Sequence, residues 1–428
     1  MHETAARPER AFLVGVRDQT VQAPEADSLI RELASLADTQ GIEVVGSMVV
    51  PLRERTAALL LGSGKADEIT QAAKAADADS IIFDTPLSPV QQRNWEKLSG
   101  LSVYDRSELI IKIFAGRAHT REASLQVELA RLQYALPRLT HSYEDLHRQR
   151  GGRYGTKGSG EQKIELDRRA ISERIRDIQD ELKDVRKSRD TQRRRRERLT
   201  LPRAAIVGYT NAGKSSLLNA LSRAQVLAED KLFATLDPTT RRLEGKHGPV
   251  LLTDTVGFVR NLPHGLVEAF KATLEEAAGA DLLVHVLDAS DPESDKHWKT
   301  TCEVLSSIGA DLSKSVVVYN KIDKLPDRNV MNFLAVRHER AVFTSVPTGE
   351  GLDELRSAIV DAIEGERGEL TLRVPPERYD LVSLLYSQGA VLSEDHDGQA
   401  SIIRCRVGER LRPQVEAFIA EPDATHSP

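Results

Sequence analysis

The sequence predicts a multidomain α/β protein made of an N-terminal α/β domain, an antiparallel helical hairpin, a doubly wound α/β domain and a small C-terminal α+β module. Three observations lead to this prediction. The 428 residues exceed the size of one ordinary domain. Short apolar runs alternate with helical patterns in two separate regions. Between these regions, two apolar stripes at coiled-coil spacing flank a glycine-rich stretch. We place the four parts at residues 1–121, 122–200, 201–365 and 366–428.

The composition excludes several classes of protein. Hydrophobic residues make up 40% of the chain and charged residues 29%, as in a folded globular protein. No apolar run approaches the roughly 18 residues of a membrane span, and Ala11–Val16 is too short for the core of a secretory signal. Cys302 and Cys405 form no Cys-x-x-Cys pair, which argues against a disulfide framework and a thiolate zinc site. We therefore expect a cytoplasmic monomer without a membrane-spanning segment.

The N-terminal domain is predicted from alternating strand and helix patterns. Strands are expected at residues 11–16, 43–50, 57–61 and 80–83, and helices at residues 29–39 and 66–75. Because this alternation is typical of βαβ units, we expect a mostly parallel sheet.

The helical hairpin is predicted from leucines at positions 125, 129, 132, 136 and 139 and from a second apolar stripe between Ile164 and Val185. Pro137 is expected to bend or end the first helix. Between the stripes, residues 151–160 contain five glycines. Such a tip buries little surface alone, so it either stays mobile or orders against a partner or a nucleotide.

A basic block follows the second stripe. Residues 183–203 include ten Lys or Arg and three Asp or Glu, although the whole chain has a net charge of −6. Such a block indicates either a polyanionic partner or a solvated helix face, and charge alone does not choose between them.

The third domain is predicted to be doubly wound. Its strands are expected at residues 204–207, 250–252, 282–287, 316–319 and 341–343. A short strand–helix–strand pattern at residues 370–374, 381–388 and 400–407 then predicts the C-terminal module.

The first motif of the third domain is a phosphate-binding loop of the GxxxxGK[ST] type, between a strand and a helical run. Its residues are Gly208, Tyr209, Thr210, Asn211, Ala212, Gly213, Lys214 and Ser215. Glycines let backbone N–H groups surround phosphate oxygens, Lys214 reaches the β- and γ-phosphates, and the Ser215 hydroxyl can bind Mg²⁺. The position of the motif between a strand and a helix predicts a P-loop domain.

Two further motifs end strands of the same domain. In the first, Asp254, Thr255, Val256 and Gly257, the carboxylate can hold Mg²⁺ through water and the Gly257 N–H can meet a γ-phosphate. In the second, Asn320, Lys321 and Asp323, the carboxylate can accept hydrogen bonds from N1–H and N2–H₂ of guanine, which adenine lacks. The loop of Ser345, Val346 and Pro347 is expected to cover the base. These motifs predict a guanine-nucleotide site.

A segment between the first two motifs offers a switch threonine. It contains Phe233, Ala234, Thr235, Leu236 and Asp237. From the residues alone, Thr235, Thr239 and Thr240 are all candidates for a threonine that closes over Mg²⁺ and the γ-phosphate.

Together the motifs resemble a translation-factor-class GTPase: Gly208–Ser215, Phe233–Asp237, Asp254–Phe258, Asn320–Asp323 and Thr348–Leu355 occur in the order of that class. Upstream segments narrow the resemblance to the HflX family. These segments are Gly62–Lys65, Leu87–Arg93, Asp105–Arg106, Thr120–Glu122, Leu125–Leu129, Leu136–Arg138, Gly160–Glu161 and Glu165–Arg169. At the hairpin tip the sequence departs from the family pattern at Ser159, Gln162 and Lys163.

The resemblance implies a ribosome-associated GTPase with GTP or GDP and Mg²⁺ as ligands. It assigns Thr235 as the switch threonine and a Mg²⁺ ligand beside Ser215. It further implies that the protein binds the large ribosomal subunit and splits or rescues stalled ribosomes, with the hairpin tip reaching ribosomal RNA near the peptidyl-transferase region.

Phe258 stands where many GTPases carry a water-orienting glutamine. We therefore expect slow hydrolysis by the isolated protein, carried by Lys214, Thr235 and the Gly257 N–H and stimulated by ribosome docking. Related GTPases with an asparagine at the position of Asn211 can bind K⁺, so the resemblance implies K⁺ as a possible further cofactor; the alternative is an asparagine tolerated in a tight turn.

Two other classes were weighed against this interpretation. A tRNA- or rRNA-acting GTPase in RNA modification or ribosome assembly is the main alternative. However, a tRNA-modifying enzyme of this type carries, by resemblance, a cysteine in its last residues, and none follows Cys405. A membrane-transport GTPase is disfavoured because no spanning segment is predicted.

Overall fold

The structure is a computed structural model of the 428-residue chain. It describes residues 7–18, 23–142, 159–197, 201–222, 232–233, 236, 238–245, 248–260, 274, 276–338, 341–365, 368–387, 390–408 and 411–420. The chain forms two compact units. The first contains Met1–Val185, Asp230–Leu236 and Asn261–Phe270, and the second contains Arg186–Glu229, Asp237–Arg260 and Lys271–Pro428.

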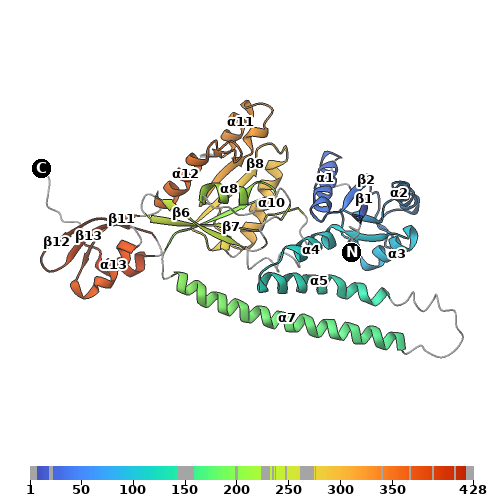
Figure 1. The fold of residues 1–428 in the computed structure, drawn as a ribbon, viewed down its shortest axis with the longest axis horizontal. Helices are drawn as coiled ribbons and strands as arrows, with labels where there is room; N and C mark the ends of the chain where they lie inside the picture. Colours follow the sequence, from blue (N-terminus) through green and yellow to red (C-terminus); the bar gives the residue numbers. More distant parts are fainter. Residues whose placement is uncertain are drawn as a thin grey trace, which may run out of the picture. The chain divides into compact units, whose positions relative to one another are not determined.

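The N-terminal part of the first unit is a parallel sheet with strand order β2-β1-β3-β4 (Figure 1). The strands are β1 Arg10–Arg17, β2 Glu43–Pro51, β3 Ser80–Phe83 and β4 Ser102–Asp105, and the helices are α1 Ala23–Thr39, α2 Ser63–Ala75, α3 Pro89–Ser99 and α4 Arg106–Arg117. The expected strands at 11–16, 43–50 and 80–83 and the parallel sheet are therefore confirmed.

The strand expected at residues 57–61 was wrong. This segment is a tight turn in which only Thr56 and Leu60 form an isolated bridge. Leu60 has a φ of 68°, in the left-handed region, which is incompatible with a continuous strand. Leu60 and Leu61 are nevertheless buried in the core of the sheet, so the apolar run reflects burial rather than strand formation.

The hairpin consists of α5 Arg121–Ser142 and the N-terminal part of α7 Ser159–Glu197. Leu125, Ile178 and Leu182 form its buried seam, with Leu129, Leu132 and Val185 packed against them. Ion pairs join Arg121 to Glu181 and Glu128 to Arg174, so the helices run antiparallel as predicted. The glycine-rich tip lies mostly outside the described residues, as do the side chains of Ser159, Gln162 and Lys163.

The first hairpin helix does not end at Pro137, as one alternative had allowed, but continues to Ser142. The missing N–H of a mid-helix proline costs about 3 kcal/mol. Tertiary contacts offset this cost, because Arg138 donates hydrogen bonds to Gln92 Oε1 at 2.8 Å and to the Leu87 carbonyl at 2.9 Å.

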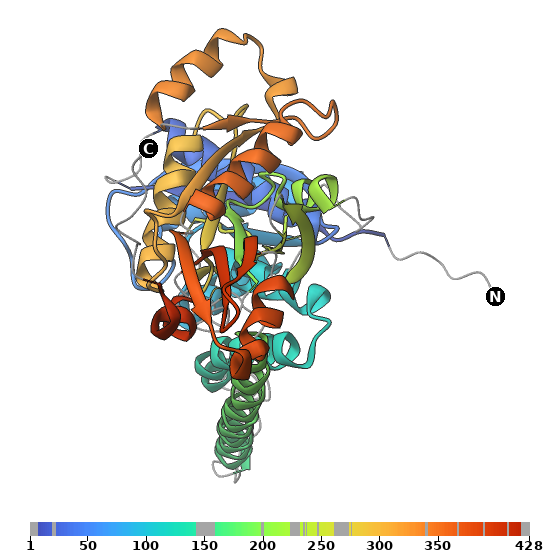
Figure 2. The same ribbon diagram turned by 90° about the vertical axis from the view of Figure 1, so that its left-hand side faces the viewer.

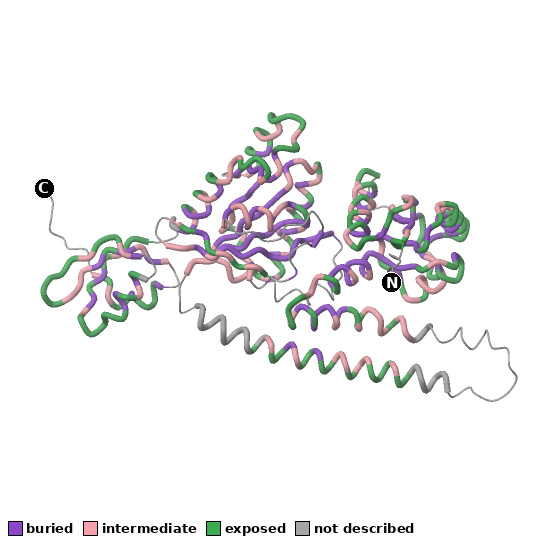
Figure 3. The backbone as a smooth tube through the Cα atoms, in the orientation of Figure 1, coloured by how far each residue is buried: buried purple, intermediate pink, exposed green. Residues whose placement is uncertain are grey.

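The second unit is built on a six-stranded sheet with order β10-β9-β8-β5-β7-β6. Its strands are β5 Arg203–Gly208, β6 Thr239–Gly245, β7 Gly248–Asp254, β8 Leu282–Asp288, β9 Ser315–Asn320 and β10 Val342–Phe343. All neighbours pair in parallel except β6, an antiparallel edge strand that the sequence pattern did not predict. The central strands are buried (Figure 3).

Helices cover both faces of this sheet. The helices α8 Lys214–Ser222 and α12 Leu352–Gly365 contribute Leu217, Leu218, Leu355 and Ile359 to one core cluster. The helices α10 Ser294–Ser307 and α11 Asn329–Arg337 contribute Trp298 and Leu334 to another cluster. The doubly wound fold is thus confirmed.

The C-terminal module is an antiparallel sheet with order β11-β13-β12 (Figures 1 and 2). It contains β11 Gly368–Val374, α13 Tyr379–Ser387, β12 Val391–His396 and β13 Ser401–Val407. The expected strands and helix are present, and β12 is an additional strand. The remaining described elements are short helical turns. One follows β9, η1 Ile322–Lys324, and three lie in the C-terminal module: η2 Pro376–Arg378, α14 Arg412–Val415 and η3 Glu416–Phe418. Among the described residues no helix is long and apolar enough to span a membrane.

Candidate nucleotide-binding site

The phosphate-binding loop connects β5 to α8, as the motif requires. Gly208 and Gly213 have positive φ angles of 146° and 94°. A Cβ atom would lie 2.2 Å from the Val286 carbonyl oxygen at Gly208 and 2.2 Å from Asn320 Nδ2 at Gly213. Glycine is therefore required at both positions by conformation and by space.

Lys214 is the buried cation of the loop, with 6% of its surface exposed. Its Nζ donates a hydrogen bond of 2.7 Å to the carbonyl of Tyr209. The pKa of Lys214 is lowered to about 8, mainly by burial and also by the positive charge of Lys321, while the Asp254 carboxylate opposes the shift. The ammonium group is therefore poorly solvated, which favours its interaction with a phosphate.

This pKa makes the binding of GDP depend on pH. A bound phosphate stabilises the protonated form of Lys214, whereas the free pocket gives up the proton near pH 8. We expect the affinity for GDP to fall about tenfold between about pH 7 and pH 9, with proton uptake on binding at the higher pH. Calorimetric titration in buffers of different ionisation enthalpy measures both effects. Lys214→Arg keeps its charge over this range and should abolish the pH dependence; an unchanged affinity in the wild type would contradict the prediction.

Oxygen ligands suitable for Mg²⁺ meet beside Lys214. The Ser215 hydroxyl donates to Asp254 Oδ2 at 2.6 Å, and Asp254 is fully buried at the end of β7. A hydroxyl and a carboxylate at this spacing fit the oxygen preference of Mg²⁺, so the residues present are compatible with the ion. The adjacent Thr255 is anchored by its hydroxyl, which donates to the Ile206 carbonyl at 2.7 Å.

Gly257 lies directly against the phosphate-binding loop. A Cβ atom at this position would be 2.8 Å from Lys214 Nζ and 2.8 Å from Thr210 Cγ2. The next residue, Phe258, is 3% exposed and forms a parallel bridge with Tyr209. Any larger residue at 257 would separate the two segments.

The base-recognition motif lies at the neighbouring strand ends. Asn320 Nδ2 donates to the Ala212 carbonyl at 2.9 Å, and Asn320 Oδ1 accepts from the Thr344 hydroxyl at 3.1 Å. Asp323 Oδ1 accepts from the Ser345 hydroxyl at 2.7 Å, which links the motif to the loop of Ser345, Val346 and Pro347. Asn320 thus contacts the phosphate-binding loop directly, and Asp323 contacts the loop expected to cover the base.

The expected switch segment is described only in part. Phe233 and Leu236 are buried and belong to the first unit, where the Phe233 ring lies 4.5 Å from that of Phe114. Ala234, Thr235 and Asp237 lie outside the described residues. The other candidate threonines, Thr239 and Thr240, are in β6, where Thr240 Oγ1 is 3.0 Å from Thr253 Oγ1.

Two ion pairs at the site were not predicted from the sequence. Lys321, with a left-handed φ of 65°, pairs with Asp288 at 2.9 Å. Arg260 pairs with Glu293 at 3.0 Å. Asp288 ends strand β8, at the edge where the motifs gather, so its position could have indicated a role at the site. No feature of the sequence around Glu293 indicates that it pairs with Arg260.

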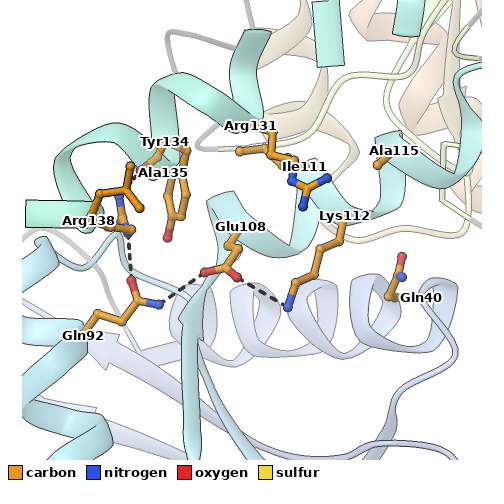
Figure 4. Close-up of a pocket in the computed structure, with 11 residues that line it drawn as sticks. Gln40, Gln92, Glu108, Ile111, Lys112, Ala115, Arg131, Tyr134, Ala135 and Arg138 are labelled. Carbon is orange, nitrogen blue, oxygen red and sulfur yellow. Dashed lines mark hydrogen bonds and ion pairs between the residues drawn. The ribbon is translucent and has the colours of Figure 1, made fainter. Parts of the chain in front are cut away.

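A separate cavity of about 490 Å³ lies within the first unit, between α4, α5 and neighbouring residues (Figure 4). Its polar side chains bond to one another: Arg138 to Gln92 at 2.8 Å, Gln92 to Glu108 at 3.3 Å and Glu108 to Lys112 at 3.5 Å. The described residues contain no cluster of three or more potential metal ligands. None of the residues that line the cavity belongs to a nucleotide-binding motif.

Comparison with known families agrees with the geometry. Residues 27–115 match the GTP-binding GTPase N-terminal family, residues 117–196 the GTP-binding GTPase middle region, and residues 203–321 the 50S ribosome-binding GTPase family.

Two relatives that match nearly the whole chain bear the name GTPase HflX. The chain is 46% identical to the GTPase HflX of Akkermansia muciniphila, over 98% of this chain and 100% of that protein. It is 41% identical to the GTPase HflX of Escherichia coli (strain K12), over 87% of this chain and 88% of that protein. A solved GTP-binding protein from the archaeon Sulfolobus solfataricus, in complex with GDP, is 24% identical with a TM-score of 0.45, over 83% of this chain and 98% of that one. The nucleotide-binding motifs, the order of the matched families and the coverage of both relatives over most of their length point to one family. The chain belongs to the HflX family of GTPases.

Proposed function

We propose that this protein binds GTP, hydrolyses it to GDP and phosphate, and acts on the large ribosomal subunit. The observation that carries the proposal is the convergence of Lys214, Ser215, Asp254 and Asn320 at the carboxyl edge of one sheet, with Asp323 on the adjoining turn. Ligands bind at this edge in doubly wound folds. The homologues named GTPase HflX support the reaction.

The guanine base would be selected by Asp323. The Ser345 hydroxyl orients one carboxylate oxygen, so the group can accept from N1–H and N2–H₂ of guanine. The backbone of Ser345, Val346 and Pro347 would cover the base, and Asn320 and Lys321 would hold the loops around it.

We further propose that Ser215 and Thr235 ligate Mg²⁺, with Asp254 acting through water. When bound, Mg²⁺ neutralises charge on the β- and γ-phosphates. Asn211, whose φ of 59° places it in the left-handed part of the loop, is the proposed K⁺ ligand. Lys214 and the Gly257 N–H would stabilise negative charge on the terminal phosphate.

The isolated protein should hydrolyse GTP slowly. The Phe258 ring is buried and has no group that could orient a water molecule. The proposed stimulating partner is the large ribosomal subunit with its RNA, which the match to the 50S ribosome-binding family supports. By the same proposal, the protein is a cytoplasmic monomer that splits or rescues stalled ribosomes through its glycine-tipped hairpin.

Multiple-turnover GTP hydrolysis with and without purified large subunits tests the proposal. We expect marked stimulation by the subunit and a higher rate in KCl than in NaCl. Equal rates with and without subunits would remove the ribosomal role, and equal rates in the two salts would remove the role of K⁺. Stimulation by free tRNA or rRNA, but not by subunits, would favour an RNA-modifying or assembly GTPase. Co-sedimentation with a GTP analogue, with GDP and without nucleotide identifies the state that binds ribosomes.

A further inference from the structure

The segment after Gly257 is bonded to the phosphate-binding loop along its length. The Phe258 N–H donates to the Gly208 carbonyl at 3.1 Å, and the Phe258 carbonyl accepts from the Thr210 N–H at 2.8 Å. A third bond uses a side chain: the Arg260 N–H donates to the Tyr209 hydroxyl at 2.7 Å. Tyr209 therefore connects the first turn of the phosphate-binding loop to the third residue after Gly257.

The start of α10 holds both partners of this third bond. The Arg260 guanidinium donates to Glu293 Oε2 at 3.0 Å, and their side chains are only 9% and 14% exposed. The Tyr209 ring stacks on the His297 ring, with centroids 3.7 Å apart and planes inclined by 10°. Because Glu293 and His297 are four residues apart at the same helix end, one rigid element positions both Tyr209 and Arg260.

The close approach of Gly257 to the phosphate-binding loop leaves little room for a terminal phosphate. Even a methyl group on Gly257 would be 2.8 Å from Lys214 Nζ and from Thr210 Cγ2. In P-loop proteins the lysine of the loop contacts the β- and γ-phosphates, and by the function proposed above the terminal phosphate lies between Lys214 and the Gly257 N–H. Lys214 Nζ is held at 2.7 Å by the Tyr209 carbonyl, and a Cβ atom on Gly257 would also lie 2.9 Å from the Thr210 Cα atom. A phosphoryl group is bulkier than a methyl group, so a terminal phosphate placed there displaces Gly257 from the loop, whereas a diphosphate makes no such demand.

We propose that Tyr209, Arg260 and Glu293 form a latch that sets the preference of the pocket between nucleoside triphosphate and diphosphate. The closed latch holds Gly257 against Lys214 and so disfavours the triphosphate. Opening it lengthens the bond from Arg260 to the Tyr209 hydroxyl and strains the Arg260–Glu293 pair. Tyr209 and Glu293 are thus positioning residues that act on the terminal phosphate through Gly257. This inference rests on the proposed binding of guanine nucleotides.

Equilibrium titration of the full-length protein with fluorescent mant-GDP and with mant-GppNHp, which is not hydrolysed, tests the latch. The readout is the ratio of the two dissociation constants. We expect Tyr209→Phe, which removes one hydrogen bond, and Glu293→Gln, which leaves the Arg260 guanidinium without this counter-charge, each to shift this ratio about threefold to tenfold towards mant-GppNHp. In the double variant the shifts should be less than additive, because both changes weaken one coupled unit.

A matched control is Tyr319→Phe. Tyr319 is a buried tyrosine of β9, and its hydroxyl has no hydrogen-bond partner within the part of the chain that the structure describes. For Tyr319→Phe, the ratio of the two dissociation constants should equal that of the wild type. A ratio unchanged in the latch variants, a shift towards mant-GDP, or an equal loss of affinity for both nucleotides would overturn the latch. Failure of the wild type to bind either nucleotide would instead overturn the proposed function, so the two outcomes are distinguishable.

Discussion

Replacing Asp323 with asparagine is expected to lower the affinity for GTP and GDP on the order of 10⁴-fold. The carboxylate has two acceptor oxygens for N1–H and N2–H₂ of guanine, and asparagine retains only one. The amide group of the variant would donate to an oxygen at position 2 of the base, so xanthosine nucleotides should bind to Asp323→Asn better than to the wild type. Fluorescent nucleotide titration with guanine, xanthine and adenine triphosphates measures the change of specificity.

The control for this change is Asp327→Asn. Asp327 is exposed, four residues away, and caps the following turn by accepting from the Asn329 N–H at 2.9 Å. Its replacement should leave the specificity unaltered. If Asp323→Asn still bound GTP with wild-type affinity, or if the wild type bound ATP as tightly as GTP, the assignment of this pocket would be refuted.

Replacing Arg106 with methionine should have the largest effect on stability. Arg106 is 1% exposed and pairs at 2.9 Å with Asp84, which is buried, and with Glu32, whose side chain is 9% exposed. Removing the guanidinium leaves two carboxylates in the core of the N-terminal sheet without their main counter-charge. Breaking a buried pair in this way costs about 3–5 kcal/mol. Urea denaturation, followed by circular dichroism, measures the free energy of unfolding.

Two further variants show whether the loss of stability comes from unpaired buried charge. Arg121→Met removes an arginine whose side chain is 76% exposed and which pairs with Glu181, so its effect should stay below about 1 kcal/mol. Adding Glu32→Gln and Asp84→Asn to Arg106→Met should restore part of the lost stability, because no buried charge then remains in the triad. Equal destabilisation by Arg106→Met and Arg121→Met would contradict the argument.

Local sequence patterns predicted much of the fold, because many elements satisfy a local rule. The apolar runs that became β1, β5, β8 and β9 are buried in sheets, and the 4–3 spacing of leucines became the hairpin seam. The turn at Leu60 was mistaken for a strand because its left-handed φ depends on packing against the sheet rather than on residue type. The edge strand β6 was missed because its alternating pattern, with a single buried residue, carries little apolar signal.

The candidate site likewise contains residues that a local motif identified and residues that no local pattern marks. Glycines and charged residues of the phosphate-binding loop were identified because their spacing along the chain is fixed by the shape of a phosphate. The Arg260–Glu293 and Lys321–Asp288 pairs join residues 33 positions apart in each case, so no local pattern could reveal them. Such pairs depend on the order of strands and helices, which becomes visible only in the folded chain.

The pairing of β6 with β7 has a consequence for the two segments proposed to sense the nucleotide. Thr239 lies opposite Asp254, and the ladder continues to Gly245 opposite Gly248. Thr239, two residues after the segment that ends at Asp237, and the carboxylate that begins the next motif are therefore cross-strand neighbours. By the function proposed above, a displacement of β6 is transmitted across this ribbon to Asp254, so we expect the two segments to rearrange in one concerted event with one shared rate constant.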